Sequence, residues 1–225
     1  NLFEAQDSSG NVGASINAAL EFTNSGGFAS TLQIGPGTTV SATLQTVIGA
    51  GASGGGDGSS TVIGSNAGGS ASFGGVCIGS AANILADHGI AIGAGAHTFN
   101  NVGAIVIGHS AKPSYGVGYG VCIGKSASFT AANQFVSGSS SYPINEVYFG
   151  KGVTNATPTN YTLHGTGGSG TDIAGGDITI AGGKGTGTGV GGDIVFQTAT
   201  AGSTGSGLNS LATALTISSV TQNVL

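Results

Sequence analysis

The 225-residue chain carries a net charge of −5, and only 6% of its residues are charged, against about 25% in an average soluble domain. It contains 46 Gly, and its four basic residues are all Lys. With no cluster of basic residues to meet phosphates, the composition argues against nucleic-acid binding. No run of about 18 apolar residues is present, so insertion into a membrane is not expected.

The first predicted segment covers residues 1–33. Turn-forming residues occupy 8–11, and apolar and polar residues alternate over 14–22. This alternation predicts a strand, with a helix as the alternative. Two consecutive glycines then interrupt the pattern, and a second alternating stretch over 28–34 leads into the next segment.

The second segment, residues 34–153, is an array of one repeated phrase, an apolar pair followed by Gly-x-x-Ala. Successive copies are 14 to 16 residues apart. A period this short, with a fixed glycine, predicts a solenoid whose coils stack on one another. Each coil has room for only two short strands, so we expect a thin, two-walled roll. The copies begin at Val47, Val62, Cys77, Ala91, Val106 and Cys122.

A glycine follows the apolar pair in every copy. We expect these glycines to lie where a Cβ atom is not tolerated, either at positive φ or against a neighbouring backbone. Replacing Gly93 with Val should therefore destabilise the protein far more than replacing Gly95, which occupies a variable position. With one register before and one after the main series, the structural glycines are Gly35, Gly49, Gly64, Gly79, Gly93, Gly108, Gly124 and Gly138.

The two residues of each apolar pair must point to opposite faces of their strand. The column from Ile48 to Ile123 is uniform in size, so we expect it to fill the core of each chain. The column from Val47 to Cys122 varies in size, so we expect it on a wall shared between chains. Cys77 and Cys122, three coils apart, are too distant to form a disulfide within one chain. On a shared wall they would be crosslinkable between chains by mild oxidation.

The third segment, residues 154–225, changes the period to about 16. The stretch 176–181 returns as 192–197, and we interpret 161–164 and 214–217 as an earlier and a later copy. The linkers consist almost entirely of Gly, Thr and Ser. Such short strands on such linkers cannot bury a core within one chain. We expect them to need partner chains, most economically identical ones.

The Ile-Gly-x-x-Ala phrase at this spacing resembles the head repeats of trimeric autotransporter adhesins, which also recur in tail fibres of tailed bacteriophages. The resemblance covers 34–127 well and 128–153 weakly. The repeats of the third segment resemble the shaft of a phage tail fibre. Together they imply an all-β fold, a parallel β-roll or β-solenoid followed by a β-rich shaft, assembled as a homotrimer of intertwined or side-by-side chains.

Residue types that carry catalysis do not gather in the sequence. The acidic residues are scattered without a glycosidase pair, and neither a nucleophile motif nor a phosphate-binding loop is present. We therefore expect neither enzymatic activity nor a cofactor. Asp177 and Asp193 occupy equivalent repeat positions, which favours hydrogen bonds in turns over contacts with ions or sugars.

Two sets of side chains are candidates for binding sites. The histidines lack the His-x-His pattern of a metal site on a threefold axis, so surface or corner positions are favoured and no metal is expected; they are His88, His97, His109 and His164. The aromatic residues Tyr115, Tyr119 and Phe129 are candidates for stacking against a receptor sugar. Packing in the core or between chains is the favoured alternative for them.

These features predict a structural, non-enzymatic fibre protein of a tailed-phage virion, a tail fibre or similar appendage that presents or spaces a receptor-binding tip. The expected partners are identical chains, other tail or baseplate proteins, and a host-surface receptor such as a glycan. The alternative is the head module of a bacterial trimeric adhesin on the cell surface. A depolymerising tailspike is disfavoured, because such enzymes need larger coils and grouped carboxylates.

Overall fold

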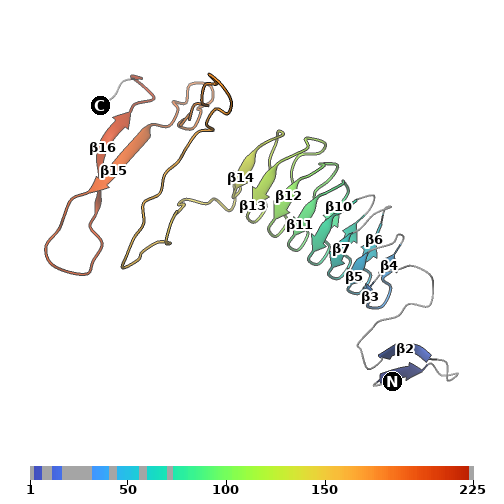
Figure 1. Cartoon of the computed structure of the whole chain (residues 1–225). Helices are drawn as coiled ribbons and strands as arrows, with labels where there is room; N and C mark the ends of the chain where they lie inside the picture. Colours follow the sequence, from blue (N-terminus) through green and yellow to red (C-terminus); the bar gives the residue numbers. More distant parts are fainter. Residues whose placement is uncertain are drawn as a thin grey trace. The chain divides into compact units, whose positions relative to one another are not determined.

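The computed structural model shows an all-β chain in which a parallel β-solenoid is followed by a small antiparallel hairpin (Figure 1). It describes residues 3–6, 12–16, 32–40, 45–55, 60–69 and 73–222. These ranges contain strands and turns but no helix, hence none that is long and apolar enough to cross a membrane. The predicted all-β fold with a parallel β-solenoid is confirmed. The chain divides into two units, Asn1–Val147 and Tyr148–Leu225.

Near the N-terminus, β1 (Phe3–Gln6) and β2 (Val12–Ile16) form an antiparallel pair. The strand predicted over 14–22 is observed for its first three residues, which belong to β2. The rest of that stretch, together with the turn predicted at 8–11, lies outside the described residues.

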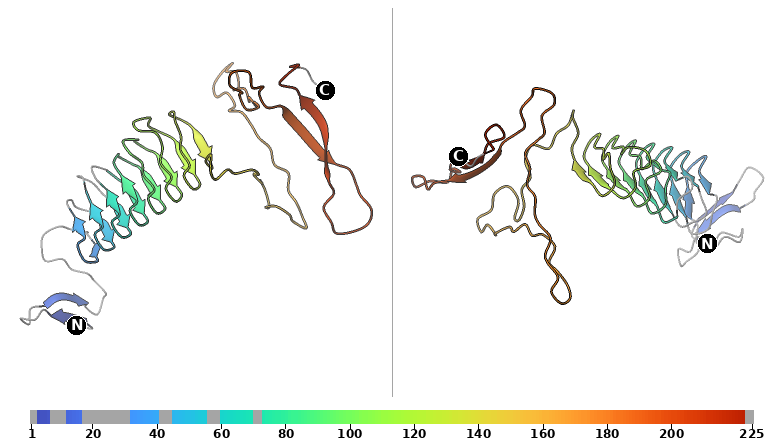
Figure 2. Two further views of the ribbon diagram at one scale, coloured as in Figure 1. Left: turned by 180° about the vertical axis from the view of Figure 1, so that it is seen from behind. Right: turned by 90° about the horizontal axis from the view of Figure 1, so that it is seen from above.

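The long wall of the solenoid is an eight-stranded parallel sheet in the order β14-β13-β12-β11-β9-β7-β5-β3. Each strand comes from one coil, and neighbours are in register, so that Ile48 pairs with Ile63 and Ile63 with Ile78. Figure 2 shows the coils stacked one on the next. The strands are β3 (Leu32–Ile34), β5 (Thr46–Ile48), β7 (Thr61–Ile63), β9 (Val76–Ile78), β11 (Ile90–Ile92), β12 (Ile105–Ile107), β13 (Val121–Ile123) and β14 (Phe135–Ser137).

The second wall is a four-stranded parallel sheet that covers only the first part of the array. Its strands are β4 (Thr39–Val40), β6 (Ser53–Gly54), β8 (Gly68–Gly69) and β10 (Asn83–Ile84). A single bridge from Asn83 to His97 carries the pairing into one further coil, and the later coils are closed on this side by loops. The thin, two-walled roll is confirmed as far as this coil.

The Gly-x-x-Ala part of each phrase is a turn that leads the chain away from the long wall. The Ala N–H donates to the carbonyl oxygen of the Gly three residues earlier, as from Ala52 to Gly49 at 3.1 Å. The residue before the Ala has a left-handed backbone, whether it is Gly51 (φ +65°), Asn66 (φ +52°) or Ala81 (φ +54°). Small and turn-forming residues are favoured there, because positive φ costs L-residues free energy.

The phrase glycines let consecutive coils approach one another at this corner. From Gly35 to Gly124 the φ of the phrase glycines lies between +124° and +144°, a region nearly closed to residues with a Cβ. A Cβ on Gly93 would lie 2.5 Å from the carbonyl oxygen of Gly108 in the next coil. Both conditions expected of these positions, positive φ and a neighbouring backbone, are therefore met.

The core of the solenoid is narrow and is filled mainly by small side chains. From the long wall, the middle residue of each strand from β5 to β13 points inward and is fully buried. From the phrase turn, the Ala of each copy fills the space beside it. These two columns are Val47, Val62, Cys77, Ala91, Val106 and Cys122, and Ala52, Ala67, Ala82, Ala96, Ala111 and Ala127.

The predicted assignment of the two columns is therefore wrong. The column that starts at Val47 fills the core of the chain, whereas the Ile column lies on the outer face, where Ile34 is 48% and Ile123 is 37% exposed. The physical reason is the width of the roll. Val, Cys or Ala fits beside the invariant Ala of the turn, and Ile would overfill that space.

The corrected assignment changes what is expected of the thiols. Cys77 and Cys122 are free and lie three strands apart in the long wall. This agrees with the prediction that they are too distant to form a disulfide within one chain. Burial raises the pKa of both thiols to about 11, and backbone hydrogen bonds with Gly68 and Phe129 offset part of the rise. Because both thiols face the core of their own chain, crosslinking between folded chains is no longer expected.

Within 148–222, the only strands are β15 (Ile194–Ala199) and β16 (Leu211–Ile217), which pair antiparallel. They contain most of the last two copies of the predicted repeat. The two earlier copies, at 161–164 and 176–181, form no strand, contrary to prediction. No residue of 148–222 is buried, so a single chain supplies no core against which those copies could pack.

We expect Gly93→Ala to destabilise the solenoid far more than Gly95→Ala. The Gly93 substitution combines φ +131° with a clash against the Gly108 carbonyl, and should lower the free energy of unfolding by at least about 3 kcal/mol. Gly95 has φ +65°, in the position where Ala81 adopts φ +54°, so about 1 kcal/mol is expected there. Chemical unfolding followed by circular dichroism measures both; equal losses would contradict the repeat register.

We expect the two thiols to reduce stability between pH 9 and pH 11. An unfolded thiol releases its proton near pH 9.0, whereas Cys77 and Cys122 in the folded chain hold theirs to about pH 11. In this window the unfolded state binds fewer protons, so stability falls as pH rises, by about 1.4 kcal/mol per pH unit for each thiol.

The control for this pH dependence is the double variant Cys77→Val/Cys122→Val, which places in the column the residue already present at Val47 and Val62. Its free energy of unfolding should fall less steeply with rising pH, because the contribution of the two thiols is removed. Unfolding titrations at pH 8, 9 and 10 compare the two proteins. Identical slopes would show that the thiols do not resist ionisation in the folded chain.

Candidate self-association surface

The outer face of the long wall carries a continuous apolar stripe. Because the middle residue of each strand points inward, the residues before and after it point outward, and those from β5 to β13 are partly or fully exposed. We call this surface the Ile stripe. Its residues are Thr46, Ile48, Thr61, Ile63, Val76, Ile78, Ile90, Ile92, Ile105, Ile107, Val121 and Ile123.

The Ile stripe contains no charged residue and runs along the stacking direction. Six in-register strands at about 4.8 Å spacing make it roughly 24 Å long. Parallel sheets are normally covered on both faces by other layers. In this unit the second wall lies on the opposite side of the core, so the unit's own described residues provide no layer over the stripe. It is therefore the candidate surface for self-association.

The second unit also exposes apolar side chains along most of its length. The rings of Phe149 and Tyr161 stack at a centroid distance of 4.2 Å, yet both remain more than half exposed. Lys151 donates hydrogen bonds to the carbonyl and the hydroxyl of Thr157 at 2.7 and 3.0 Å. Such contacts order local loops without burying a core. The remaining exposed apolar residues include Val153, Leu163, Ile173, Ile178, Ile180, Val190 and Leu208.

An aromatic row lies where the second wall gives way to loops. The rings of His97 and Phe99 stack at 4.0 Å, and Phe99 lies 6.2 Å from the ring of Tyr115 in the next coil. The side-chain amide of Asn100 donates to the Tyr115 hydroxyl. Burial, with a smaller effect from the charge of Lys112, lowers the pKa of His97. This favours the neutral ring, whose Nδ1 accepts the Phe99 N–H at 2.8 Å.

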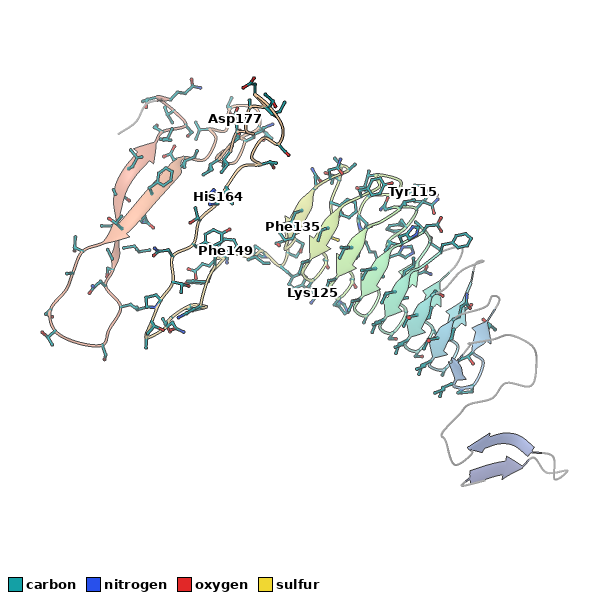
Figure 3. All side chains as sticks on the ribbon, in the orientation of Figure 1. Tyr115, Lys125, Phe135, Phe149, His164 and Asp177 are labelled. Atoms are coloured by element: carbon teal, nitrogen blue, oxygen red, sulfur yellow. The ribbon has the colours of Figure 1, made fainter. Side chains whose placement is uncertain are left out.

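A buried amide holds the loop that carries two of the predicted receptor-stacking residues. Asn101 is fully buried; its Nδ2 donates to the Ser114 carbonyl at 2.9 Å, and its Oδ1 accepts the Val117 N–H at 2.7 Å. The loop presents Tyr115 and Tyr119, which are 68% and 62% exposed. Figure 3 shows Tyr115 at the edge of the solenoid opposite the phrase corner that carries Lys125.

Phe129, the third aromatic candidate, is fully buried, which agrees with the favoured alternative of core packing and leaves its ring inaccessible to a receptor. Its ring fills the interior beyond the end of the second wall. A Cβ on Gly120 would lie 2.9 Å from that ring, so the absence of a side chain at Gly120 makes room for it.

The ionisable residues do not form a site. Across the described ranges, no three side chains of His, Cys, Asp or Glu are grouped so that they could hold a metal ion. Asp193 accepts the Ser219 N–H at 2.7 Å, and this hydrogen bond lowers the pKa of its carboxyl. Asp193 thus makes a structural contact of the kind expected for it. The exposed histidines are His88, His109 and His164.

No protein-family model matches this chain, and no curated protein is significantly similar to it. The likeness to adhesin heads and phage fibres therefore rests on the repeated phrase, its spacing and the β-solenoid that the phrase forms. These features characterise an architecture, and the biological role of the chain is proposed on other grounds below.

We expect Asn101→Ala to lower the free energy of unfolding by about 2–3 kcal/mol, because it leaves the Ser114 carbonyl and the Val117 N–H without their partner. Asn100→Ala is the matched control, since its amide contacts only the exposed Tyr115 hydroxyl, and its effect should stay within about 0.5 kcal/mol. Amide hydrogen exchange at Val117 should accelerate only in Asn101→Ala. Equal exchange in both variants would contradict the clamping role.

Proposed function

We propose that this chain is a structural, non-enzymatic subunit of an elongated homotrimeric fibre, a tail fibre or similar appendage of a tailed-phage virion. In this proposal the solenoid spaces or presents a tip that binds a receptor on the host surface. Its partners are identical chains, other tail or baseplate proteins, and the host receptor.

The observation that carries the proposal is the Ile stripe. A lone chain would keep a row of partly exposed β-branched side chains in contact with water, at a cost of about 25 cal/mol for each Å² of apolar surface. Association of identical chains through this face removes that surface. Because the stripe follows the stacking direction, such association produces an elongated particle whose rotation axis runs along the coils. Three chains around such an axis would close a triangular prism, which is the assembly that we propose.

The second unit supports the same proposal. A stripe about 24 Å long and two residues wide is smaller than the roughly 800 Å² per partner of a standard stable interface. The exposed apolar side chains of 148–222 supply the additional surface. The copies at 161–164 and 176–181, which form no strand in one chain, would acquire partners from the neighbouring chains of a shaft.

The alternative function is the head module of a bacterial trimeric surface adhesin. The phrase itself favours this alternative, because the same phrase builds adhesin heads. The Ile stripe would serve the same assembly there, on a cell surface instead of a virion. Genes beside the coding sequence separate the two: tail or baseplate genes favour the fibre, and a downstream β-barrel anchor favours the adhesin.

The assembly is tested by placing charge on the Ile stripe. In Ile78→Glu/Ile92→Glu, two carboxylates would be buried without partners between chains, which costs several kcal/mol each. The oligomer should then dissociate at least about a hundredfold more readily. Light scattering coupled to size exclusion measures the mass, and negative-stain images show the length.

The matched control is Ser80→Glu/Ala94→Glu, which adds the same charge on the same coils, at exposed positions outside the stripe. It should remain trimeric. The proposal would be contradicted if the wild-type protein is a compact monomer by size exclusion and light scattering. It would also be contradicted if the stripe variant remains as trimeric as the control.

A further inference from the structure

A shallow groove lies between two exposed aromatic rings on the last coils of the solenoid. Tyr119 and Phe135 are 62% and 68% exposed, and Figure 3 marks Phe135 in this region. Val121 lies between them, and the groove is completed by two amide side chains and two glycines. The lining residues are Gly103, Tyr119, Gly120, Val121, Asn133, Gln134 and Phe135.

The Tyr119 side of this groove is held in place from both sides. Its ring lies against Gly103, where an added Cβ would be 3.0 Å from Tyr119 Cδ1. Its carbonyl oxygen accepts the Asn133 N–H. The loop that precedes it is clamped by the buried amide of Asn101. An exposed ring in a fixed position loses little conformational freedom when it meets a ligand.

The spacing of the two aromatic residues fits one inserted ring. Tyr119 lies just before β13, and its carbonyl oxygen accepts the Asn133 N–H of the next coil, to which Phe135 in β14 also belongs. The two residues are therefore one coil apart (about 4.8 Å) and two residues apart along the strand (about 6.6 Å), so their backbones are roughly 8 Å apart. A ring stacked between two aromatic faces needs about 7–8 Å, twice the contact distance of carbon atoms.

The polar groups of the groove favour a neutral ligand rich in hydroxyls. The Gln134 side chain is fixed because its Oε1 accepts the N–H groups of Thr130 and Ala131 at 2.9 and 3.1 Å. Asn133 adds a second, exposed amide. Amides donate to and accept from hydroxyl groups, and no lining residue is charged. Aromatic faces beside amides suit a pyranose, which has an apolar C–H face and a polar rim.

We propose that the groove between Tyr119 and Phe135 binds a neutral pyranose ring, a hexose or N-acetylhexosamine, of a host-surface saccharide. The two aromatic rings cover the faces of the sugar, and Asn133 and Gln134 contact its hydroxyls. The identification of the saccharide as a host-surface ligand rests on the proposed attachment function. Val121 also belongs to the Ile stripe, and Phe135 follows it in the same outward column, so the site requires that association through the stripe leaves the coils of β13 and β14 open.

The binding test uses the full chain and an immobilised array of neutral hexose and N-acetylhexosamine oligosaccharides, with uronic and sialic acid oligosaccharides for comparison. We expect retention on at least one neutral oligosaccharide and none that depends on an acidic sugar. Tyr119→Ala and Phe135→Ala should each weaken the retained interaction at least about tenfold. Phe73→Ala, which removes another exposed ring of the solenoid, should leave it unchanged.

A second pair of variants tests whether binding depends on the position of the Tyr119 ring, without removing the ring. Gly103→Ala pushes a Cβ against the Tyr119 ring, whereas Gly116→Ala has a similar φ, +70° against +65°, and meets nothing within 4 Å. Gly103→Ala should weaken sugar binding several-fold, and Gly116→Ala should not. Thermal unfolding of both variants confirms that they are folded to the same extent.

Three results would overturn the proposal: no retention on any neutral oligosaccharide, retention only on acidic ones, or retention that is equally strong in Tyr119→Ala and Phe135→Ala. The mass of each sample is measured alongside. If the protein is a trimer but binds no neutral sugar, only the proposed sugar site is refuted. If it is a monomer that binds a neutral sugar through Tyr119, only the proposed fibre assembly is refuted.

Discussion

The close contact between consecutive coils at the phrase corner is the constraint on which the solenoid depends. There the backbone of one glycine lies against the carbonyl of the next, as Gly93 does against Gly108. This approach keeps every coil in the same register, so equivalent residues stack into straight columns. Because equivalent residues stack in this way, a residue type that recurs at one position of each coil forms a continuous surface along the whole solenoid.

The narrowness of the roll then decides which column lies inside. The turn brings an Ala to the interior in every copy, the strand residues beside it are Val, Cys or Ala, and the Ile column lies on the outer face. An interior this thin buries little apolar surface per residue. The chain therefore keeps a second apolar layer on its outer face, and its stability as a lone molecule is correspondingly limited.

Much of this architecture was predictable, because a glycine at fixed spacing has few structural explanations. Gly49 and its equivalents indicated both the coil length and the corner at which Cβ is excluded. The assignment of the inner and outer columns from the sequence is wrong, because a uniform residue size does not mark a core. The invariant Ala52 column was the signal that the interior is too narrow for Ile48. Nothing in the sequence shows that Phe129 fills the interior beside Gly120, which lies at the start of the same coil.

The candidate sites were predictable only in part, for a related reason. Tyr115 and Tyr119 are separated by three residues, and nothing in their spacing reveals that the buried amide of Asn101 on the previous coil shapes their loop. Similarly, Phe135 meets the same groove as Tyr119 only because the coils stack. In the second unit, the repeats correctly indicated β15 and β16. The earlier copies lack strands because pairing depends on surfaces that one chain does not provide.

The orientation of the hydrogen bonds in the long wall has a mechanical consequence. Bonds between parallel strands run from coil to coil, along the stacking axis, and each strand in this wall is only three residues long. Tension applied along the axis of a single solenoid would therefore load a few hydrogen bonds at a time, and the coils would peel away in sequence. Neighbouring chains packed with their coils at staggered heights would distribute the same tension over several ladders at once.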